Sequence, residues 1–220
     1  MSIQFFLRFG QLEHLQQLLS SGHVYINRAK FFKKDLPHPR FDKNEGKLSI
    51  SHLADAYIDI RPKGEVEWKK LNVQKGVFEN SLNLEYTYIY SLFSILETET
   101  RESEFFEFSD DIKKMGKHFI IIRNPKEFMT RMLTALEKNS YCYEHGVVNY
   151  YDPQLDHKNL GLFHKGNQFQ AQKEYRIAIG LESEGQEPQQ EHIQFNIGSL
   201  EDIAEICETN QYRGLQFKWE

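Results

Sequence analysis

The stretch FHKGNQFQAQKEYRIAI (residues 163–179) joins a polar loop with aromatic residues to the start of an apolar strand. In an extended chain, residues two apart face the same side. Gln172 and Glu174 are therefore expected to share one side, with Tyr175 and Ile177 turned toward the core on the other. A carboxylate and an amide side by side at the mouth of a strand form a candidate functional site.

An ordinary exposed strand edge would explain the same residues. In that interpretation Glu174 pairs with a neighbouring cation, either Lys173 or Arg176. Residues elsewhere in the chain are needed to choose between a functional and a structural role for this carboxylate.

Strand signals dominate the chain outward from this stretch. Short runs rich in Phe, Tyr and Ile favour a pleated, half-buried surface. The expected strands are Ile3–Arg8, Leu84–Ile95, His118–Ile122, Tyr175–Leu181, His192–Ile197 and Leu215–Trp219. The last of them is expected to close the sheet at the C-terminus. The two strands that flank the polar segment Glu182–Glu191 are expected to pair across it as a hairpin. Two more polar segments, Lys33–Lys47 and Glu97–Glu104, are expected to be loops.

Three amphipathic helices are expected among these strands. The first has leucines at helical spacing from Leu12 onward and ends at Gly22, where a left-handed cap belongs. The second begins at Asn124, a good capping residue that Pro125 follows. The third begins at Ser199 with a buried stripe formed by Leu200, Ile203, Ile206 and Cys207. Mostly strands with a few helices predict an α+β fold.

Composition limits the class of protein. A length of 220 residues and 14% aromatic residues predict one folded domain, residues 1–220, and not a disordered chain. Two cysteines, Cys142 and Cys207, cannot form a disulfide framework, and neither a membrane span nor a secretory signal is recognised, which favours the cytoplasm. The net charge of −5 argues against a main task of holding duplex DNA by its phosphates.

Two more strands carry polar residues among apolar neighbours. Arg8, in QFFLRFG (residues 4–10), either faces solvent or lines a cleft and binds a phosphate or carboxylate. Ser91 and Ser94 interrupt the run YSLFS (residues 90–94), and a buried hydroxyl needs a hydrogen-bond partner. These serines either bond to the backbone or belong to a polar site.

Motifs for metals and phosphates are missing from the sequence. The nine histidines include no His-Glu-x-x-His pair, no cysteine pair has ligand spacing, and no glycine-rich phosphate loop is present. No metal is therefore expected. A metal-dependent nuclease built on Asp152 and Glu174 stays as an alternative, although no acidic-x-Lys pair accompanies them.

The order of these features resembles the Arg–Ser–Glu class of ADP-ribosyltransferase folds. It runs from an arginine in the first strand through a helix ending in glycine and a serine-bearing central strand to Gln-x-Glu at a late strand. The resemblance implies a mostly antiparallel, split β-sheet core with three or so flanking helices. It also implies that Arg8 contacts NAD⁺, that Ser91 or Ser94 supports the nicotinamide pocket, that Glu174 holds the ribose 2′-hydroxyl, and that Gln172 positions the acceptor.

The chain also resembles a family of uncharacterised bacterial proteins found in phage-defence settings. The shared pattern includes LLSSGHVYIN (residues 18–27), and from it Tyr25 and Asn27 are assigned to NAD⁺ binding. Two features depart from these patterns. The usual Ser-Thr-Ser triplet has only single serines as stand-ins, and Asn-Asp-Pro is replaced by KKDLP (residues 33–37).

The resemblance implies an NAD⁺-dependent ADP-ribosyltransferase, acting as a toxin or phage-defence effector that an antitoxin holds in check. Glutamine at position 172 resembles transferases that modify amides or bases, so a nucleobase of RNA or DNA, or an amide side chain of a protein, is the expected acceptor. A carboxylate at the ribose stabilises the positive charge that builds as nicotinamide leaves, with no metal needed. The alternative is a non-catalytic ligand-sensing or protein-interaction module on the same fold.

Overall fold

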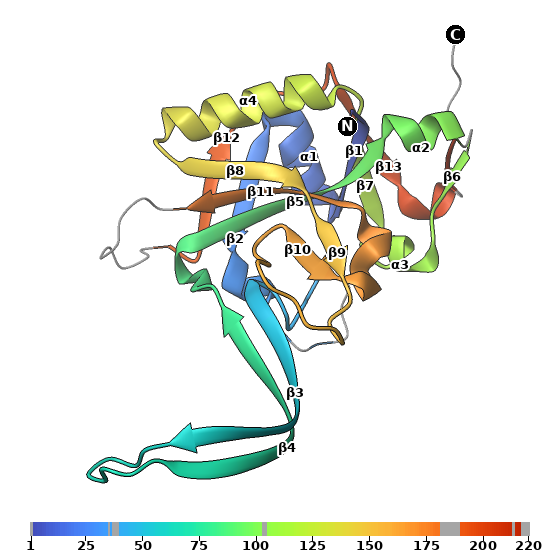
Figure 1. Ribbon diagram of the computed structural model, residues 1–220. Helices are drawn as coiled ribbons and strands as arrows, with labels where there is room; N and C mark the ends of the chain where they lie inside the picture. Colours follow the sequence, from blue (N-terminus) through green and yellow to red (C-terminus); the bar gives the residue numbers. More distant parts are fainter. Residues whose placement is uncertain are drawn as a thin grey trace.

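The computed structural model describes residues 2–34, 36, 40–102, 105–180, 190–212 and 214–216. An eight-stranded antiparallel sheet forms its centre (Figure 1). Six strands lie in the order β12 (His192–Asn196), β2 (His23–Arg28), β5 (Thr87–Leu96), β1 (Ile3–Gly10), β7 (His118–Ile122) and β13 (Ala204–Glu208). Two more, β11 (Glu174–Gly180) and β8 (Cys142–Val147), continue from the other edge of β5. The expected α+β class with a mostly antiparallel sheet and few helices is confirmed.

The sheet forks along β5. One edge of β5 pairs with β11 over residues 87–93. The other edge pairs with β2 at residues 88–89 and with β1 at residues 93–96. β1 and β2 therefore diverge, and no described strand pairs with residues 90–92 on that edge. This fork opens the space in which the candidate site lies.

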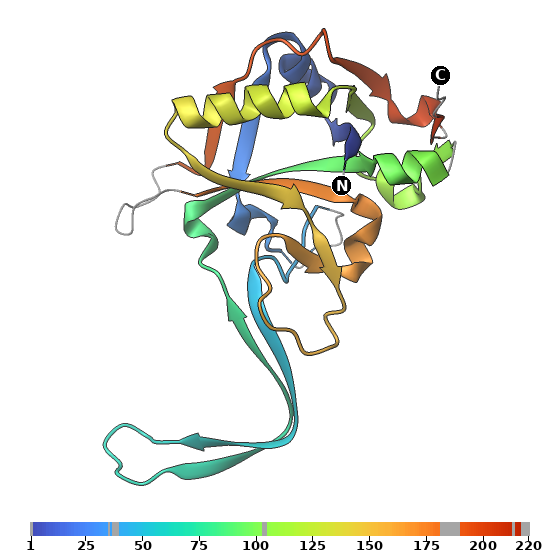
Figure 2. The same cartoon turned by 45° about the horizontal axis from the view of Figure 1, so that its top comes forward.

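Helices α1 (Leu12–Ser21) and α4 (Pro125–Lys138) cover one face of the sheet (Figure 2). Both helices were expected from the sequence and are confirmed. Gly22 is left-handed with φ 66°, and a side chain there would collide with the backbone of Gly198. The Asn124 side chain accepts a hydrogen bond from the Glu127 N–H at 3.0 Å. The largest core cluster lies under these helices and includes Phe6, Leu15, Leu18, Tyr90, Leu92, Phe128, Met132, Tyr175 and Ile177.

Shorter elements cover the opposite face. A second, phenylalanine-rich cluster lies there beneath α3 (Asp110–Lys113). The remaining elements are α2 (Glu97–Glu102), the pair β6 (Phe105–Glu107) and β14 (Gly214–Gln216), the parallel pair β9 (Asn149–Tyr151) and β10 (His164–Gly166), and the 3₁₀ turns η1 (Ala29–Phe32), η2 (Leu84–Tyr86), η3 (Asn167–Gln172) and η4 (Thr209–Gln211). No described helix has both the length and the apolar character that a membrane span requires.

A long β-hairpin projects from the body and was not anticipated from the sequence. It consists of β3 (Lys47–Ile60) and β4 (Lys69–Ser81), and both views show it extending well beyond the sheet (Figures 1 and 2). We call it the arm. Its exposed apolar side chains are Tyr57, Ile58, Ile60, Val66, Trp68, Leu71, Val77 and Phe78.

Three expectations for the second half of the chain are wrong in part. The segment after Ser199 forms turns and then strand β13, because the open edge of β7 offers it backbone partners. β11 and β12 are not a hairpin, since β5 and β8 occupy both edges of β11 while β12 pairs with β2. The last strand spans Gly214–Gln216 and pairs with β6 outside the main sheet. Residues 217–219 and most of the polar segment at 182–191 lie outside the described residues.

The segment Glu97–Glu104, expected to be a loop, contains helix α2 over Glu97–Glu102. Acidic residues in its first turn, Glu97 and Glu99, favour a helix because they face the positive end of the helix dipole. The segment at 33–46 is free of regular secondary structure where it is described, as expected, and Lys47 begins the arm.

Candidate functional site

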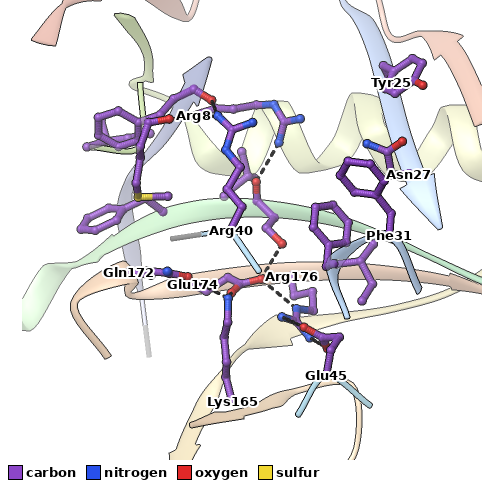
Figure 3. Close-up of a pocket in the computed structure, with 18 residues that line it drawn as sticks. Arg8, Tyr25, Asn27, Phe31, Arg40, Glu45, Lys165, Gln172, Glu174 and Arg176 are labelled. Carbon is purple, nitrogen blue, oxygen red and sulfur yellow. Dashed lines mark hydrogen bonds and ion pairs between the residues drawn. The ribbon is translucent and has the colours of Figure 1, made fainter. Parts of the chain in front are cut away.

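A pocket lies at the fork of the sheet, between β1, β2, β5 and β11 (Figure 3). Six of the seven residues proposed from the sequence line it, although they come from four separate segments of the chain: Arg8, Tyr25, Asn27, Ser91, Gln172 and Glu174. The pocket also contains four charged residues that the sequence analysis did not select: Arg40, Glu45, Lys165 and Arg176. The fork therefore gathers most of the predicted site into one cavity.

Glu174 lies at the floor of this pocket and is only 5% exposed. Its Oε1 accepts hydrogen bonds from Ser91 Oγ at 2.5 Å and from Arg176 Nε at 2.9 Å, and its Oε2 accepts one from Lys165 Nζ at 3.1 Å (Figure 3). Burial acts to raise the pKa of Glu174, yet the two cations hold it well below its usual range. The carboxylate is therefore ionised at neutral pH.

The register of β5 and β11 explains why these groups meet. Ser91 lies directly opposite Arg176, and Glu174 is two residues from Arg176 on the same face of the sheet. Ser91 and Glu174 are then diagonal neighbours across the two strands, within reach of a side-chain hydrogen bond. Tyr175 and Ile177 face the opposite side and pack in the main core, as expected.

Arg176 is almost fully buried, with 1% exposure. Its Nη1 and Nη2 bind the two carboxylate oxygens of Glu45 at 2.8 and 3.2 Å, and Nη1 also donates to the carbonyl oxygen of Leu162. Burial acts to lower the pKa of Arg176, but Glu174 and Glu45 raise it above its usual value. Arg176 thus joins two buried carboxylates, and the pairing of Glu174 with Arg176 expected for a structural role is observed.

Gln172 and Glu174 lie side by side, but not by strand alternation. Gln172 ends the turn η3, and Lys173 adopts a left-handed conformation with φ 41° before β11 begins. Lys165 Nζ connects the two residues, since it donates to Gln172 Oε1 at 2.8 Å as well as to Glu174. The expectation that both belong to one extended strand is wrong, because a turn separates them.

Ser94 does not line the pocket. Its backbone N–H and its Oγ donate to the carbonyl oxygen of Lys173 at 2.9 and 2.8 Å. The ammonium group of Lys173 turns away from the pocket and pairs with Glu99. Ser94 therefore fixes the turn that brings Gln172 and Glu174 together.

Two arginines lie on the wall opposite Glu174 (Figure 3). Arg8 Nη1 donates to the carbonyl oxygen of Ser91 at 2.8 Å, and the guanidinium stacks on Tyr90 at 3.9 Å from the ring centroid. Arg40 Nη2 donates to the carbonyl oxygens of Phe9 and Met115 at 3.1 and 3.0 Å. Burial and, second, the nearby charge of Arg8 lower the pKa of Arg40.

Aromatic residues form the remaining wall. Tyr25 is partly exposed and stacks on His192 at 4.4 Å between ring centroids. Phe31 contacts Phe32 and Phe41 edge to face, and the ammonium group of Lys34 lies over its ring at 4.1 Å. These rings give the pocket flat apolar surfaces close to its charged groups.

The charges of the pocket favour an anionic ligand. Four cationic and two acidic side chains line it, an excess of two positive charges in a chain whose net charge is −5. A ligand with a phosphate beside a polar ring system matches arginines next to aromatic walls. A second pocket adjoins the first, shares Met115 and Gln172 with it, and is lined by the rings of Phe41 and Phe169.

Some of these residues carried a sequence signal and others did not. Arg176 interrupts the apolar run of β11, and a charge in a buried strand predicts a partner. Lys165 lies within the stretch that first suggested the site. Arg40 and Glu45 come from a segment with no regular pattern, so only the folded structure reveals them.

The described residues include no group of three or more His, Cys, Asp or Glu side chains placed to hold a metal ion. Asp152, which the nuclease alternative pairs with Glu174, accepts a hydrogen bond from the Gln154 N–H and does not line the pocket where the chain is described. Comparison with protein-family models, with curated proteins and with solved structures found no match to this chain.

Proposed function

We propose that this protein is an NAD⁺-dependent ADP-ribosyltransferase that acts in the cytoplasm as a toxin or phage-defence effector, restrained by an antitoxin partner. One observation carries the proposal. The pocket combines a buried, ionised carboxylate, Glu174, with two arginines, Arg8 and Arg40. An anion-binding wall opposite a carboxylate suits a dinucleotide that carries a diphosphate at one place and develops positive charge at another.

The diphosphate of NAD⁺ is assigned to the arginines. A guanidinium group forms paired, charge-assisted hydrogen bonds with phosphate oxygens. Arg8 is already held by the Ser91 carbonyl and the Tyr90 ring, so little side-chain freedom is lost on binding. Tyr25 and Asn27 from β2, together with Phe31, supply the walls for the nicotinamide end.

Glu174 is assigned to the ribose that loses nicotinamide. A carboxylate can accept about four hydrogen bonds. Among the described contacts Oε1 accepts two and Oε2 accepts one, which leaves Oε2 able to accept the ribose 2′-hydroxyl. When the bond from ribose C1′ to the nicotinamide nitrogen breaks, its electron pair leaves with nicotinamide and positive charge spreads over the sugar. The ionised carboxylate stabilises that charge.

The acceptor is assigned to the side of Gln172. This residue lies where the two pockets meet, and the second pocket presents Phe41 and Phe169. A nucleobase or an amide side chain approaching from there attacks C1′ with a nitrogen lone pair and then releases its proton. Flat apolar rings suit stacking of a base, and an amide suits hydrogen bonding to its edge.

The test uses NAD⁺ labelled in its adenylate phosphate, with a cell extract that contains RNA, DNA and protein. Label transferred by the wild type and not by Glu174→Gln supports a transferase, and nuclease or protease treatment then identifies the acceptor class. The expected loss for removing one electrostatic stabiliser of a transition state is at least about 100-fold in rate. No label transfer and no nicotinamide release by the folded wild type would refute the proposal.

A second candidate is a ligand-sensing or protein-interaction module without catalysis. It is favoured by the same carboxylate, since three hydrogen bonds to Glu174 also satisfy a purely structural ion network. Such a module would bind NAD⁺ or a related dinucleotide without consuming it. Calorimetric binding with no nicotinamide release over hours would favour this candidate over the transferase.

A further inference from the structure

The charges around Glu174 form one continuous buried chain. Glu45 binds Arg176, Arg176 binds Glu174, and Glu174 binds Lys165. Each of the four side chains is at most 6% exposed. Two acidic and two cationic groups alternate, so the chain of charges is electrically neutral when all four are ionised.

Glu45 binds both terminal nitrogens of the Arg176 guanidinium. Nη1 and Nη2 both donate to Glu45, Nη1 also donates to the carbonyl oxygen of Leu162, and Nε donates to Glu174 at 2.9 Å. A planar guanidinium has fixed donor directions, so the bidentate contact on one side sets the angle of the contact on the other. The direction from which Arg176 approaches Glu174 is therefore set by Glu45.

The turn that carries Glu45 is held by hydrogen bonds on both sides of this residue. Asp42 accepts hydrogen bonds from the Asn44 and Glu45 backbone N–H groups at 2.8 and 3.0 Å. Gly46 follows with φ 72°, and a side chain there would collide with Leu84. Its carbonyl oxygen accepts a hydrogen bond from the Leu82 N–H at 2.8 Å. Glu45 is thus presented from a fixed support at the base of the arm.

We propose that Glu45 is a positioning residue for Glu174, acting through Arg176, and that its negative charge keeps the network neutral during catalysis. The inference rests on the proposed transferase function. Without the charge of Glu45, two cations would face a single carboxylate. The network would then carry one net positive charge and would oppose the positive charge that develops on the ribose.

This role gives Glu45 a kinetic signature that a merely structural residue lacks. The variant Glu45→Gln keeps the shape of the side chain and removes its charge. We expect kcat for nicotinamide release to fall about 100-fold, as for loss of one electrostatic stabiliser. KM for NAD⁺ should stay the same or decrease, because a more positive pocket attracts the anionic dinucleotide. A damaged fold would instead raise KM.

A compensating variant sharpens the test. In Glu45→Gln with Arg176→Gln, one anion and one cation are removed together, and Glu174 with Lys165 stays neutral. This double variant restores neutrality but loses the contact by which Arg176 orients Glu174. It should therefore recover about tenfold in kcat over Glu45→Gln alone and stay below the wild type. The matched control is Glu144→Gln, which changes an exposed carboxylate on strand β8 and should behave as the wild type.

The outcomes distinguish failure of the transferase function from failure of the role of Glu45. A wild type that releases no nicotinamide refutes the transferase function and with it the role of Glu45 in catalysis. An active wild type with kcat of Glu45→Gln within about threefold overturns the role of Glu45 alone. A double variant no faster than the single overturns the role of its charge. If Glu45→Gln does not fold, Glu45→Asp tests the position, since it keeps the charge and shortens the side chain. An unchanged kcat for Glu45→Asp would then overturn the positioning role of Glu45, since this variant changes only the reach of the carboxylate.

Discussion

At the scale of single residues, Glu174 has both a place in the pocket and a structural role. It is the floor of the pocket, and it is also a link in a buried ionic network. Removing one partner of a buried ion pair typically costs about 3–5 kcal/mol, because the other charge is left without compensation. Loss of stability after substitution of Glu174 therefore does not argue against catalysis, and a test must separate the two effects.

Substitution of Glu174 together with Lys165 makes that separation. Glu174→Gln alone should lower the free energy of unfolding by about 3 kcal/mol, since Lys165 and Arg176 then outnumber Glu45. Adding Lys165→Met restores neutrality and should recover about 2 kcal/mol, without any recovery of nicotinamide release. Urea unfolding and initial rates measure the two quantities. Recovery of activity in the double variant would contradict a direct role for Glu174.

The two carboxylates of the network should titrate in opposite directions from the ordinary glutamate pKa of about 4.3. Burial raises the pKa of Glu45, against the opposing charges of Arg176 and Lys165, and Glu174 adds to the increase. Tyr151, on the neighbouring strand β9, has its own pKa raised to about 12 and stays neutral in this range. Glu174, with its lowered pKa, stays ionised throughout.

This difference predicts the acid side of the pH profile. As pH decreases, Glu45 is the first of the two to gain a proton, and the network then becomes positive. In the wild type kcat should therefore fall with an apparent pKa above about 4.3, whereas Glu45→Gln should be slow and independent of pH over the same range. Rates of nicotinamide release between about pH 4.5 and 8 measure this. An identical acid limb in both proteins would assign the titration to another group.

The same carboxylates give opposite contributions to stability. The lowered pKa of Glu174 means that its contribution is complete above about pH 4.3 and is lost as pH decreases below that value. The raised pKa of Glu45 has the opposite sign, since its neutral form is favoured in the folded state and stability decreases as pH rises through the range between its unfolded and folded values. The difference in free energy of unfolding between the wild type and each Gln variant should therefore change with pH in opposite directions for Glu174 and Glu45. Urea unfolding at several pH values measures these differences.

The sequence predicted the chemically unusual residues better than the ordinary ones. Arg8 and Ser91 were selected because each is polar within an apolar strand, and such positions need a partner. Glu174 was selected because it follows Gln172 by two residues at the mouth of a strand. Glu45 and Arg40 were not selected, because their role depends on where an irregular segment folds back. Ser94, selected by the same pattern as Ser91, donates its hydroxyl to the backbone carbonyl of Lys173 and does not line the pocket.

At the scale of elements, the fork between β1 and β2 is the feature that makes the site. Runs of apolar and aromatic residues predicted β1, β5, β7 and β11. They did not predict which strand lies beside which. For residues 203–207 the apolar spacing fits a helix or a strand, and the free edge of β7 decides for β13. Long-range pairing of this kind is invisible to a local pattern.

The fork also predicts the effect of losing Arg8. Its guanidinium fills the space where β5 lacks a strand and satisfies the Ser91 carbonyl. Arg8→Ala should weaken NAD⁺ binding at least about tenfold, and it should lower the free energy of unfolding by about 1–2 kcal/mol through the unpaired carbonyl. Calorimetry and urea unfolding measure these effects. Arg123→Ala, at an exposed arginine after β7, is the matched control.

If Arg8→Ala binds NAD⁺ with unchanged affinity, Arg8 does not contact the ligand. Weaker binding by Arg123→Ala of similar size would instead point to a general effect of net charge. Because electrostatic attraction between exposed charges is screened by salt, the difference between the two variants should persist at about 0.15 M salt if Arg8 contacts the ligand directly.

At the scale of the whole molecule, the body and the arm differ in what stabilises them. The body packs helices and short elements on both faces of one sheet. Beyond residue 52 the arm has no described layer over either face, and its hydrogen bonds, ion pairs and ring contacts between residues 53 and 76 join the arm to itself. Nearer the body, Ile50 exchanges backbone hydrogen bonds with His157, and His52 contacts Asp156.

The distal arm should therefore be dispensable for the fold and the pocket. Replacing residues 53–76 with Asn-Gly leaves His52 opposite Val77 and closes the hairpin with a two-residue turn that strand twist favours. Because Glu45 and its turn lie on the body side of the cut, the melting temperature should stay within a few degrees and the affinity for NAD⁺ should not change. Thermal denaturation and calorimetry measure both. A large decrease in melting temperature would mean that the distal arm stabilises the body, and weaker NAD⁺ binding with an intact fold would mean that it shapes the pocket through Glu45.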